Sequence, residues 1–177
     1  HSAGTGEVIF GEKTGTDVGR GIAADIDPNY RGFEMWSTAN GNVYDCKGNI
    51  IATKNRPSVN FRVYWDGDLG RELLDGNKLV KYSIKSGAER IYYNSKNSTL
   101  PGSINNGTKS NACLTADLFG DWREEIVLRY GDGVRIYFST IPTDYRLTTL
   151  MHDSQYRCAI AWQNVGYNQS PHTSYYI

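Results

Sequence analysis

The sequence predicts an all-β fold, and two observations lead to this prediction. Its 177 residues include 13 Tyr, 4 Trp and 19 Gly, a composition that suits short strands joined by tight turns. The chain also repeats one unit three times, in which an acidic loop is followed by a strand, a tight turn and a second strand. No apolar stripe at helical spacing is long enough to predict a helix.

The three copies of this unit can be read directly from the sequence. In the first copy the acidic loop is at 25–34, the strand at 35–37, the turn at 40–42 and the second strand at 43–45. The same four parts lie at 66–72, 73–74, 75–77 and 79–84 in the second copy. In the third copy they lie at 117–125, 126–130, 131–133 and 134–138. Each turn contains an Asn-Gly or Asp-Gly pair between apolar runs, which is the strongest short signal for a β-hairpin. Each copy is therefore expected to form a hairpin that opens with an acidic loop.

The spacing of the copies predicts an architecture. Acidic loops recur at roughly 40 to 50 residues, the period of the blades of a β-propeller. Three blades cannot close a ring that usually needs four to eight, so the chain is expected to be part of a propeller. We assign 1–177 to one partial propeller domain, with blade-like units at 16–55, 56–95 and 107–140 and a closing segment at 141–177.

The acidic loops are candidate calcium sites, because calcium takes six to eight oxygen ligands, mostly from carboxylates and carbonyls. The candidate ligands are Asp25, Asp27, Asn29, the Arg31 carbonyl and Glu34 in the first loop; Asp66, Asp68 and Glu72 in the second; and Asp117, Asp121 and Glu124 or Glu125 in the third. Asp and Gly also form turns without any metal. Three copies in front of three strands favour calcium in at least one loop, where it would brace the blades.

Charge and hydropathy exclude several classes of partner. Lys and Arg number 19 and Asp and Glu also number 19, so no basic face for nucleic acid is expected. No apolar run approaches the roughly 20 residues that a membrane helix needs, so no membrane partner is expected. The chain begins with His1 and not with Met, which is typical of a processed product or an internal piece. The three cysteines allow one disulfide, but their odd number and wide spacing favour the interpretation as three buried thiols.

Two long polar sections, at 94–110 and 153–172, are the places to look for a site, because loops of that length tend to be functional. The first contains Asn106-Gly107-Thr108, which is consistent with a glycosylation acceptor, a hairpin turn or a ligand-binding loop, and then Lys109. The second contains Tyr167, which can stack on a sugar or can be an ordinary loop residue. Arg20 lies between two glycines, where a backbone can approach a ligand while the guanidinium binds a carboxylate.

The segments at 16–28, 60–68, 116–125 and 150–169 are long and specific. They closely resemble the rhamnogalacturonan lyases of polysaccharide lyase family 11, and the similarity extends over nearly the whole chain. The resemblance implies an eight-bladed, calcium-rich β-propeller that cleaves the pectin backbone between rhamnose and galacturonate by β-elimination. It also implies a polysaccharide partner and a secreted, extracellular protein. The chain matches about the last third of the family's catalytic domain, or three to four blades, so the rest of the propeller is missing or lies on another chain.

The resemblance also implies roles for individual residues. Asn106, Gly107, Thr108 and Lys109 match the family's cleft loop, Tyr167 matches its near-terminal tyrosine, and Arg20 matches its cleft arginine. β-Elimination removes the proton on C5 of galacturonate and expels the oxygen at C4, so the carboxylate must be neutralised by calcium or by Arg20. Lys109 is then the expected base. Because an ordinary lysine is protonated at neutral pH, a lysine base needs positive charge nearby, from Arg20 or calcium.

Two other functions remain open from the sequence. The chain can be a non-catalytic, calcium-braced propeller module that binds a glycan or a protein, or it can be an inert part of the lyase. A binding module shares the acidic loops and the aromatic residues with an enzyme. It need not bring Arg20 and the Lys109 loop together, so the placement of these two features separates the two functions.

Overall fold

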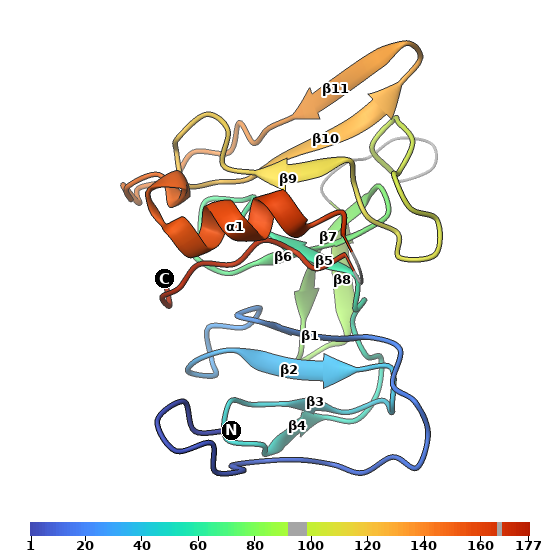
Figure 1. Ribbon diagram of the computed structural model, residues 1–177, viewed down its shortest axis with the longest axis vertical. Coiled ribbons are helices and arrows are strands. Elements are labelled where there is room, and N and C mark those ends of the chain that lie inside the picture. The colour runs from blue at the N-terminus through green and yellow to red at the C-terminus, as the bar shows by residue number, and fades with distance from the viewer. Residues whose placement is uncertain (92–98, 166–167) are drawn as a thin grey trace.

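The computed structural model describes residues 1–91, 99–165 and 168–177, which form three antiparallel sheets (Figure 1). The first sheet contains, in spatial order, β1 (Gly21–Ala24), β2 (Glu34–Ser37), β3 (Val43–Tyr44) and β4 (Ile50–Ala52); the second contains β5 (Phe61–Val63), β6 (Glu72–Asp75), β7 (Lys78–Ser83) and β8 (Ala88–Ile91); and the third contains β9 (Leu114–Ala116), β10 (Glu125–Tyr130) and β11 (Gly133–Tyr137). The prediction of an all-β fold is confirmed. Among the described residues no sheet closes on itself.

The hairpins predicted from the turns are present in all three sheets. β2 pairs with β3, β6 with β7, and β10 with β11, each antiparallel. In the second sheet Asp75 lies opposite Lys78, which leaves a two-residue turn, and Gly76 adopts a φ of 64°. A glycine reaches this left-handed conformation without the steric cost that a side chain would add. The short strands before the acidic loops, β1, β5 and β9, were not predicted.

The three sheets are stacked face to face, and the second is buried on both faces. One cluster joins the first and second sheets through Ile22, Trp36 and Val43 on one side and Leu73, Val80 and Tyr82 on the other. A second cluster joins the second and third sheets through Phe61, Leu74 and Leu79 against Ile126 and Leu128. Leu73 and Leu74 alternate between these clusters because successive side chains of a strand point to opposite faces. Each fully buried leucine contributes about 1.5–3 kcal/mol.

The closing segment forms a helix that the sequence was not expected to contain. After a 3₁₀ turn at Leu150–His152 (η1), α1 spans Ser154–Trp162. Asp153 is its N-cap, and its carboxylate accepts from the backbone N–H of Gln155 at 3.0 Å. Leu150 and Tyr156 pack with Tyr64 and Trp122 in a third buried cluster. An Asp at the N-cap is an ordinary helix start. The helix buries only Tyr156 and Ala159, so its apolar stripe is too short to be recognised in the sequence.

The three cysteines differ from their predicted burial. The three thiols are free, but Cys46 and Cys158 are exposed and Cys113 is half-buried, so the interpretation as buried thiols is wrong. Cys46 lies in the turn after β3 and Cys158 on the open face of α1, where neither meets a core. No helix in the described part of the chain is long and apolar enough to cross a membrane.

Candidate functional site

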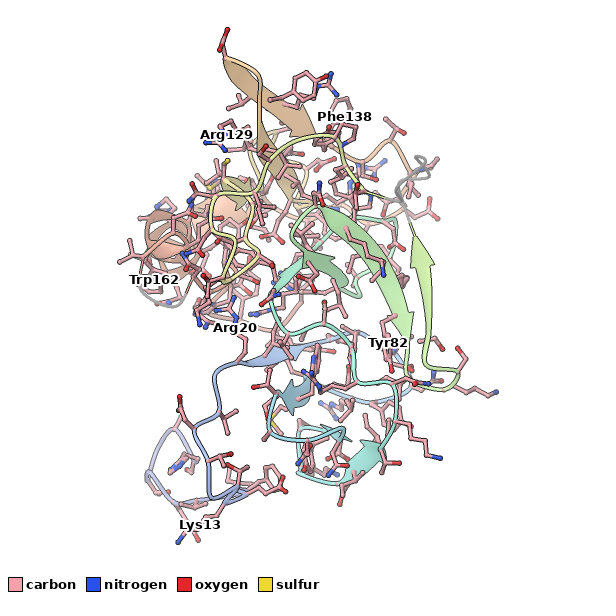
Figure 2. All side chains as sticks on the ribbon, turned by 90° about the vertical axis from the view of Figure 1, so that its right-hand side faces the viewer. Lys13, Arg20, Tyr82, Arg129, Phe138 and Trp162 are labelled. Carbon is pink, nitrogen blue, oxygen red and sulfur yellow. The ribbon has the colours of Figure 1, made fainter. Side chains whose placement is uncertain are left out.

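Arg20 lies immediately before β1 and is the centre of a buried polar cluster (Figure 2). Only 6% of its surface is exposed. Its Nε donates to Asn60 Oδ1 at 3.3 Å, and its Nη2 donates to the carbonyls of Asn60 and Asn168 at 3.1 and 2.8 Å. Asn60 in turn donates from Nδ2 to Asp75 Oδ1 at 2.7 Å. Burial lowers the pKa of Arg20, and the negative charge of Asp75 opposes this effect.

The loop that contains Lys109 reaches the same cluster through Asn106. Asn106 Nδ2 donates to Asn168 Oδ1 at 3.3 Å, while its Oδ1 accepts from the backbone N–H groups of Thr108 and Lys109 at 3.0 and 3.2 Å. The Asn106 side chain therefore shapes the loop and joins it to the C-terminal segment. Gly107 is exposed, and a Cβ there would meet nothing within 4 Å.

A second asparagine of the C-terminal segment fixes the same loop at its two ends. Asn164 Oδ1 accepts from Asn105 Nδ2 at 2.8 Å and from Asn111 Nδ2 at 2.5 Å, and Asn164 Nδ2 donates to the Cys113 carbonyl at 2.6 Å. Gln163 pairs with the backbone of Thr115 in β9 through bonds of 2.8 and 3.0 Å. The loop is therefore fixed to the segment after α1 by side-chain amides at three points.

The structure thus brings together Arg20 and Asn106, two of the predicted site residues, with Asn168 between them. Thr108 and Lys109 belong to the same loop, whereas Tyr167 lies outside the described residues. Asn60 and Asp75 were missed as site residues: Asn60 has no motif that points to a site, and Asp75 was interpreted only as part of a hairpin turn. We refer to Arg20, Asn60, Asp75, Asn106 and Asn168 as the Arg20 cluster.

The acidic loops lie at the opposite end of the strands from the Arg20 cluster. Arg20 and Asn60 come directly before β1 and β5, whereas Asp25 and Asp66 come after these strands. In Figure 1 the loop around residues 105–111 lies on the right, and the C-terminus, where the Tyr176 hydroxyl donates to Asp25, lies on the left. A strand of four residues spans roughly 13 Å. A cation bound in these loops would therefore lie about one strand length from Arg20.

The three acidic loops share one backbone device. In each, the glutamate that opens the next strand turns its Oε2 back onto two consecutive N–H groups of the loop. Glu34 accepts from Ile26 and Asp27, Glu72 from Trp65 and Asp66, and Glu125 from Leu118 and Phe119, at 2.7–3.2 Å. Glu125 is therefore the equivalent of Glu34 and Glu72. Glu124 is not: its carboxylate points inward, where it accepts from Tyr156 Oη at 2.7 Å and from the Tyr64 N–H at 2.9 Å.

The first loop contains a buried oxygen that lacks a partner. Glu34 is fully buried, and its Oε1 has no hydrogen-bond partner among the described residues. Burial, with the charges of Asp25 and Asp27, raises the pKa of Glu34 to about 7. Asp27 accepts from the Asn29 side chain at 2.6 Å, and the Arg31 carbonyl accepts from the Cys46 thiol at 3.1 Å. An orphaned carboxylate oxygen in a loop that carries two more carboxylates fits a hard cation such as calcium.

In the third loop several carboxylate oxygens have protein partners. Asp117 accepts from Thr149 Oγ1 at 2.7 Å and from the Leu150 N–H at 2.8 Å, and Asp121 pairs with Arg123 at 2.5 Å. Burial, with the charges of Asp117 and Asp121, raises the pKa of Glu125 to about 7.

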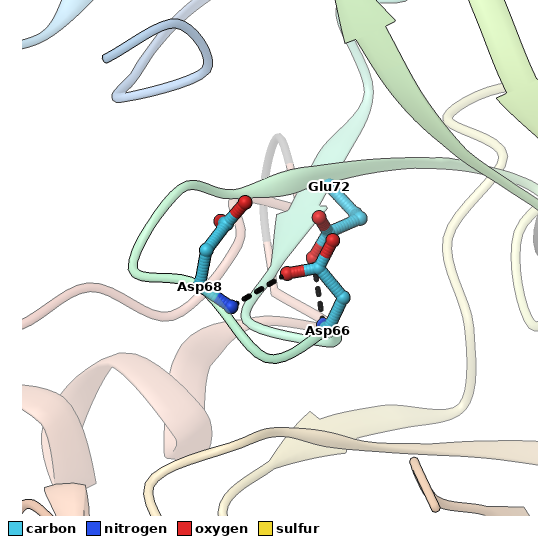
Figure 3. A group of neighbouring side chains, drawn as sticks. All are labelled: Asp66, Asp68 and Glu72. Carbon is cyan, nitrogen blue, oxygen red and sulfur yellow. Dashed lines mark hydrogen bonds between the residues drawn. The ribbon is translucent and has the colours of Figure 1, made fainter. Parts of the chain in front are cut away.

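The second loop brings three carboxylates closest together (Figure 3). Among the described residues, only Asp66, Asp68 and Glu72 place acidic oxygens all within 4.8 Å of one another. The ammonium group of Lys81, from β7, lies among them at 2.9, 2.5 and 3.1 Å. Burial raises the pKa of Glu72 to about 8 and the attraction of Lys81 opposes the rise.

The chain is similar to known proteins over almost its full length. The family model described as rhamnogalacturonan lyase family 11, C-terminal domain, matches residues 1–177. Rhamnogalacturonan endolyase YesW of Bacillus subtilis is 50% identical over 99% of this chain and 28% of its own length. Rhamnogalacturonan exolyase YesX of the same organism is 45% identical over 99% of this chain and 31% of its own length. The crystal structure of YesW superposes with a TM-score of 0.89 at 49% identity, over 99% of this chain and 30% of that one. The chain thus spans less than a third of the relatives that it matches.

Proposed function

The chain belongs to rhamnogalacturonan lyase family 11, and we propose that it is the C-terminal part of an enzyme that cleaves rhamnogalacturonan by β-elimination at the bond between rhamnose and galacturonate. Relatives of both endolytic and exolytic name match the whole chain. Their names indicate the polymer but not which mode of cleavage this protein uses. Secretion is expected for an enzyme that degrades pectin.

The observation that carries this proposal is the meeting of Arg20 and Asn106 at Asn168. A guanidinium held by Asn60 and Asn168 needs no rearrangement when a substrate arrives, and preorganised charge is the most effective kind in catalysis. A binding module has no need to fix an arginine beside a lysine-bearing loop. This placement favours a lyase over a non-catalytic glycan-binding module.

The proposed reaction assigns one task to each group. Arg20 neutralises the galacturonate carboxylate as negative charge develops on it after loss of the C5 proton. Lys109 takes that proton, and the oxygen at C4 leaves as the double bond forms between C4 and C5. Thr108 and Asn106 hold sugar hydroxyls, Gly107 lets the polymer pass close to the backbone, and Tyr167 stacks on a sugar or donates to it. The acidic loops take no part, since they lie at the far end of the strands.

We propose also that the complete protein closes its sheets into a β-propeller. Support comes from a hydrogen bond that repeats between neighbouring sheets. Arg71, the residue before Glu72, donates its N–H to the Asp25 carbonyl at 2.7 Å, and Glu124, the residue before Glu125, donates its N–H to the Tyr64 carbonyl at 2.8 Å. Each acceptor belongs to the previous sheet, where it directly precedes the two N–H groups that bond to the loop glutamate. A contact that repeats head to tail in this way generates a ring when the rotation closes.

In the proposed propeller, further sheets would join at the two ends of this repeat. By equivalence, the Phe33 N–H and the Asp117 carbonyl are the two ends of this series. The third sheet also has three strands where the others have four. Its outer face exposes Val134, Ile136 and Phe138, with 62%, 45% and 53% of their surfaces accessible. An apolar face of this kind is typical of a surface that packs on another sheet.

For calcium, we propose the first acidic loop as the best-supported site, with Asp25, Asp27 and Glu34 as carboxylate ligands and Asn29 and the Arg31 carbonyl as neutral ones. The third loop, with Asp117, Asp121 and Glu125, is a weaker candidate because none of these described carboxylates has a buried oxygen without a partner. Calcium in the first loop would neutralise the carboxylates and hold the loop against the strand that follows it.

The test is an assay of the complete protein on rhamnogalacturonan. β-Elimination leaves an unsaturated uronate, which absorbs in the ultraviolet, so absorbance should rise with wild-type protein and stay flat with Arg20→Ala. The present chain alone should show little activity, since the earlier blades contribute to the cleft. Binding of the polymer without any new absorbance would support the non-catalytic alternative.

A further inference from the structure

The side chain of Lys81 occupies the position where a metal ion is expected in the second acidic loop. Its Nζ lies 2.9 Å from Asp66 Oδ2, 2.5 Å from Asp68 Oδ2 and 3.1 Å from Glu72 Oε1. The Lys81 side chain is 21% exposed and that of Glu72 is fully buried. An ammonium group has three N–H donors and no acceptor, so three carboxylate oxygens use its full hydrogen-bonding capacity.

Comparison with the first loop shows what Lys81 provides. Glu34 and Glu72 are equivalent residues, and in both the Oε2 bonds to the loop backbone. The Oε1 of Glu34 has no partner among the described residues, whereas the Oε1 of Glu72 accepts from Lys81. One buried oxygen therefore needs a cation from solution and the other is supplied with one by the chain.

The strand register explains why, among the three described sheets, only the second provides a lysine for its loop glutamate. Leu73 lies opposite Val80, so the next pair along these strands places Lys81 opposite Glu72. The same step places Asp45 opposite Glu34 in the first sheet and Phe138 opposite Glu125 in the third. Neither Asp nor Phe carries a positive charge, so neither can pair with the glutamate that it faces.

We propose that the Lys81 ammonium is the resident cation of the second acidic loop, which therefore keeps its shape without calcium. These two loops then differ in kind: the first takes a divalent cation from solution, and in the second a lysine of the chain supplies the positive charge. Access is not the reason for this difference, because Lys81 and Asp68 line the same surface cavity of 690 Å³ as Asp25 of the first loop. The proposal concerns only the chain's own residues and does not depend on the lyase reaction.

The experiment compares wild-type protein with Lys81→Met by native mass spectrometry and by melting with and without a chelator. With the lysine removed, the three carboxylates form a vacant divalent site. Lys81→Met should bind one more calcium ion than wild type, melt several degrees lower in chelator and recover when calcium is added. Lys47→Met, which removes an exposed lysine between β3 and β4, is the matched control and should change neither the count nor the melting temperature.

An unchanged calcium count in a folded Lys81→Met protein would overturn the proposal. If that variant fails to fold, wild-type crystals grown in calcium decide the question by anomalous scattering. A calcium peak among Asp66, Asp68 and Glu72, with the lysine displaced, would also overturn it. The Lys81 ammonium still seated on the three carboxylates, with no peak there, would support it.

Discussion

Arg71 and Glu124 form a buried ion pair between the second and third sheets, with Nη1 and Oε2 3.2 Å apart and both side chains at most 1% exposed. The Arg71 guanidinium also lies over the Tyr64 ring, 3.7 Å from its centre. The backbone N–H of the same arginine bonds to Asp25 in the first sheet. A single residue thus connects all three sheets at the end that carries the acidic loops.

The first prediction concerns this ion pair. Glu124→Ala should reduce the free energy of unfolding by about 3–5 kcal/mol, because it leaves the Arg71 charge buried without its partner. The loss is measured by denaturant unfolding. The control is the pair of Arg123 and Asp121, in which the Asp121 side chain is 46% exposed. Asp121→Asn, measured in chelator, should cost about 1 kcal/mol or less. Equal losses for the two variants would show that burial does not matter here.

The second prediction concerns calcium in the first loop. Chelation should lower the melting temperature of wild-type protein and added calcium should restore it, because bound cation stabilises only the folded state. Glu34→Gln removes the charge of the carboxylate whose Oε1 lacks a partner, so the difference between chelator and calcium should shrink in this variant. Asp132→Asn, in the exposed turn between β10 and β11, should leave the difference unchanged. A wild-type melting curve indifferent to chelator would rule out a structural role for calcium.

What could be predicted from the sequence is what is local in the chain. The hairpin at Asp75 and Lys78 was found because turn residues and the alternating strands beside them lie within a few positions. The strand β5 was missed because three residues are too few to show a period. The helix α1 was missed because its apolar stripe is weak: only Tyr156 and Ala159 are buried, and the capping residue Asp153 is its main signal.

The Arg20 cluster was only partly predictable for the same reason. Arg20 could be singled out by its two flanking glycines, but its bond to Asn168 joins residues 148 positions apart. Asn60 has no motif and Asp75 has only the motif of a turn, so their place beside Arg20 comes from the contact between the first two sheets. Likewise, three acidic segments looked alike in the sequence, and only the register of β6 and β7 places Lys81 in one of them.

The third prediction is that Asn60 acts by positioning Arg20. In the complete enzyme, Asn60→Ala should lower kcat/KM by about 10- to 100-fold, since a misplacement of about 1 Å can cost 10²-fold. The melting temperature should change little. If Asn60 works through the arginine, its effect should be small when Arg20 is already replaced, so Asn60→Ala and Arg20→Lys together should cost less than the product of the two. Independent, multiplying effects would contradict the positioning role.

The last prediction concerns Lys109 and separates a base from an electrostatic contact. If Lys109 takes the C5 proton, Lys109→Ala in the complete enzyme should reduce kcat by about 10²- to 10⁴-fold, with a smaller change in KM. Lys109→Arg should fail to the same extent, because arginine keeps the positive charge but cannot be deprotonated at any working pH.

Thr108→Ala is the control from the same loop. It removes a hydroxyl but no titratable group, so it should raise KM more than it lowers kcat. The Asn106 side chain holds the loop through the N–H groups of Thr108 and Lys109, and none of these three substitutions removes those bonds. A loss of kcat therefore reports on the side chain itself and not on the shape of the loop. If Lys109→Arg kept near-normal kcat, the proton would have to go to another group, and Lys109 would serve only to hold the substrate.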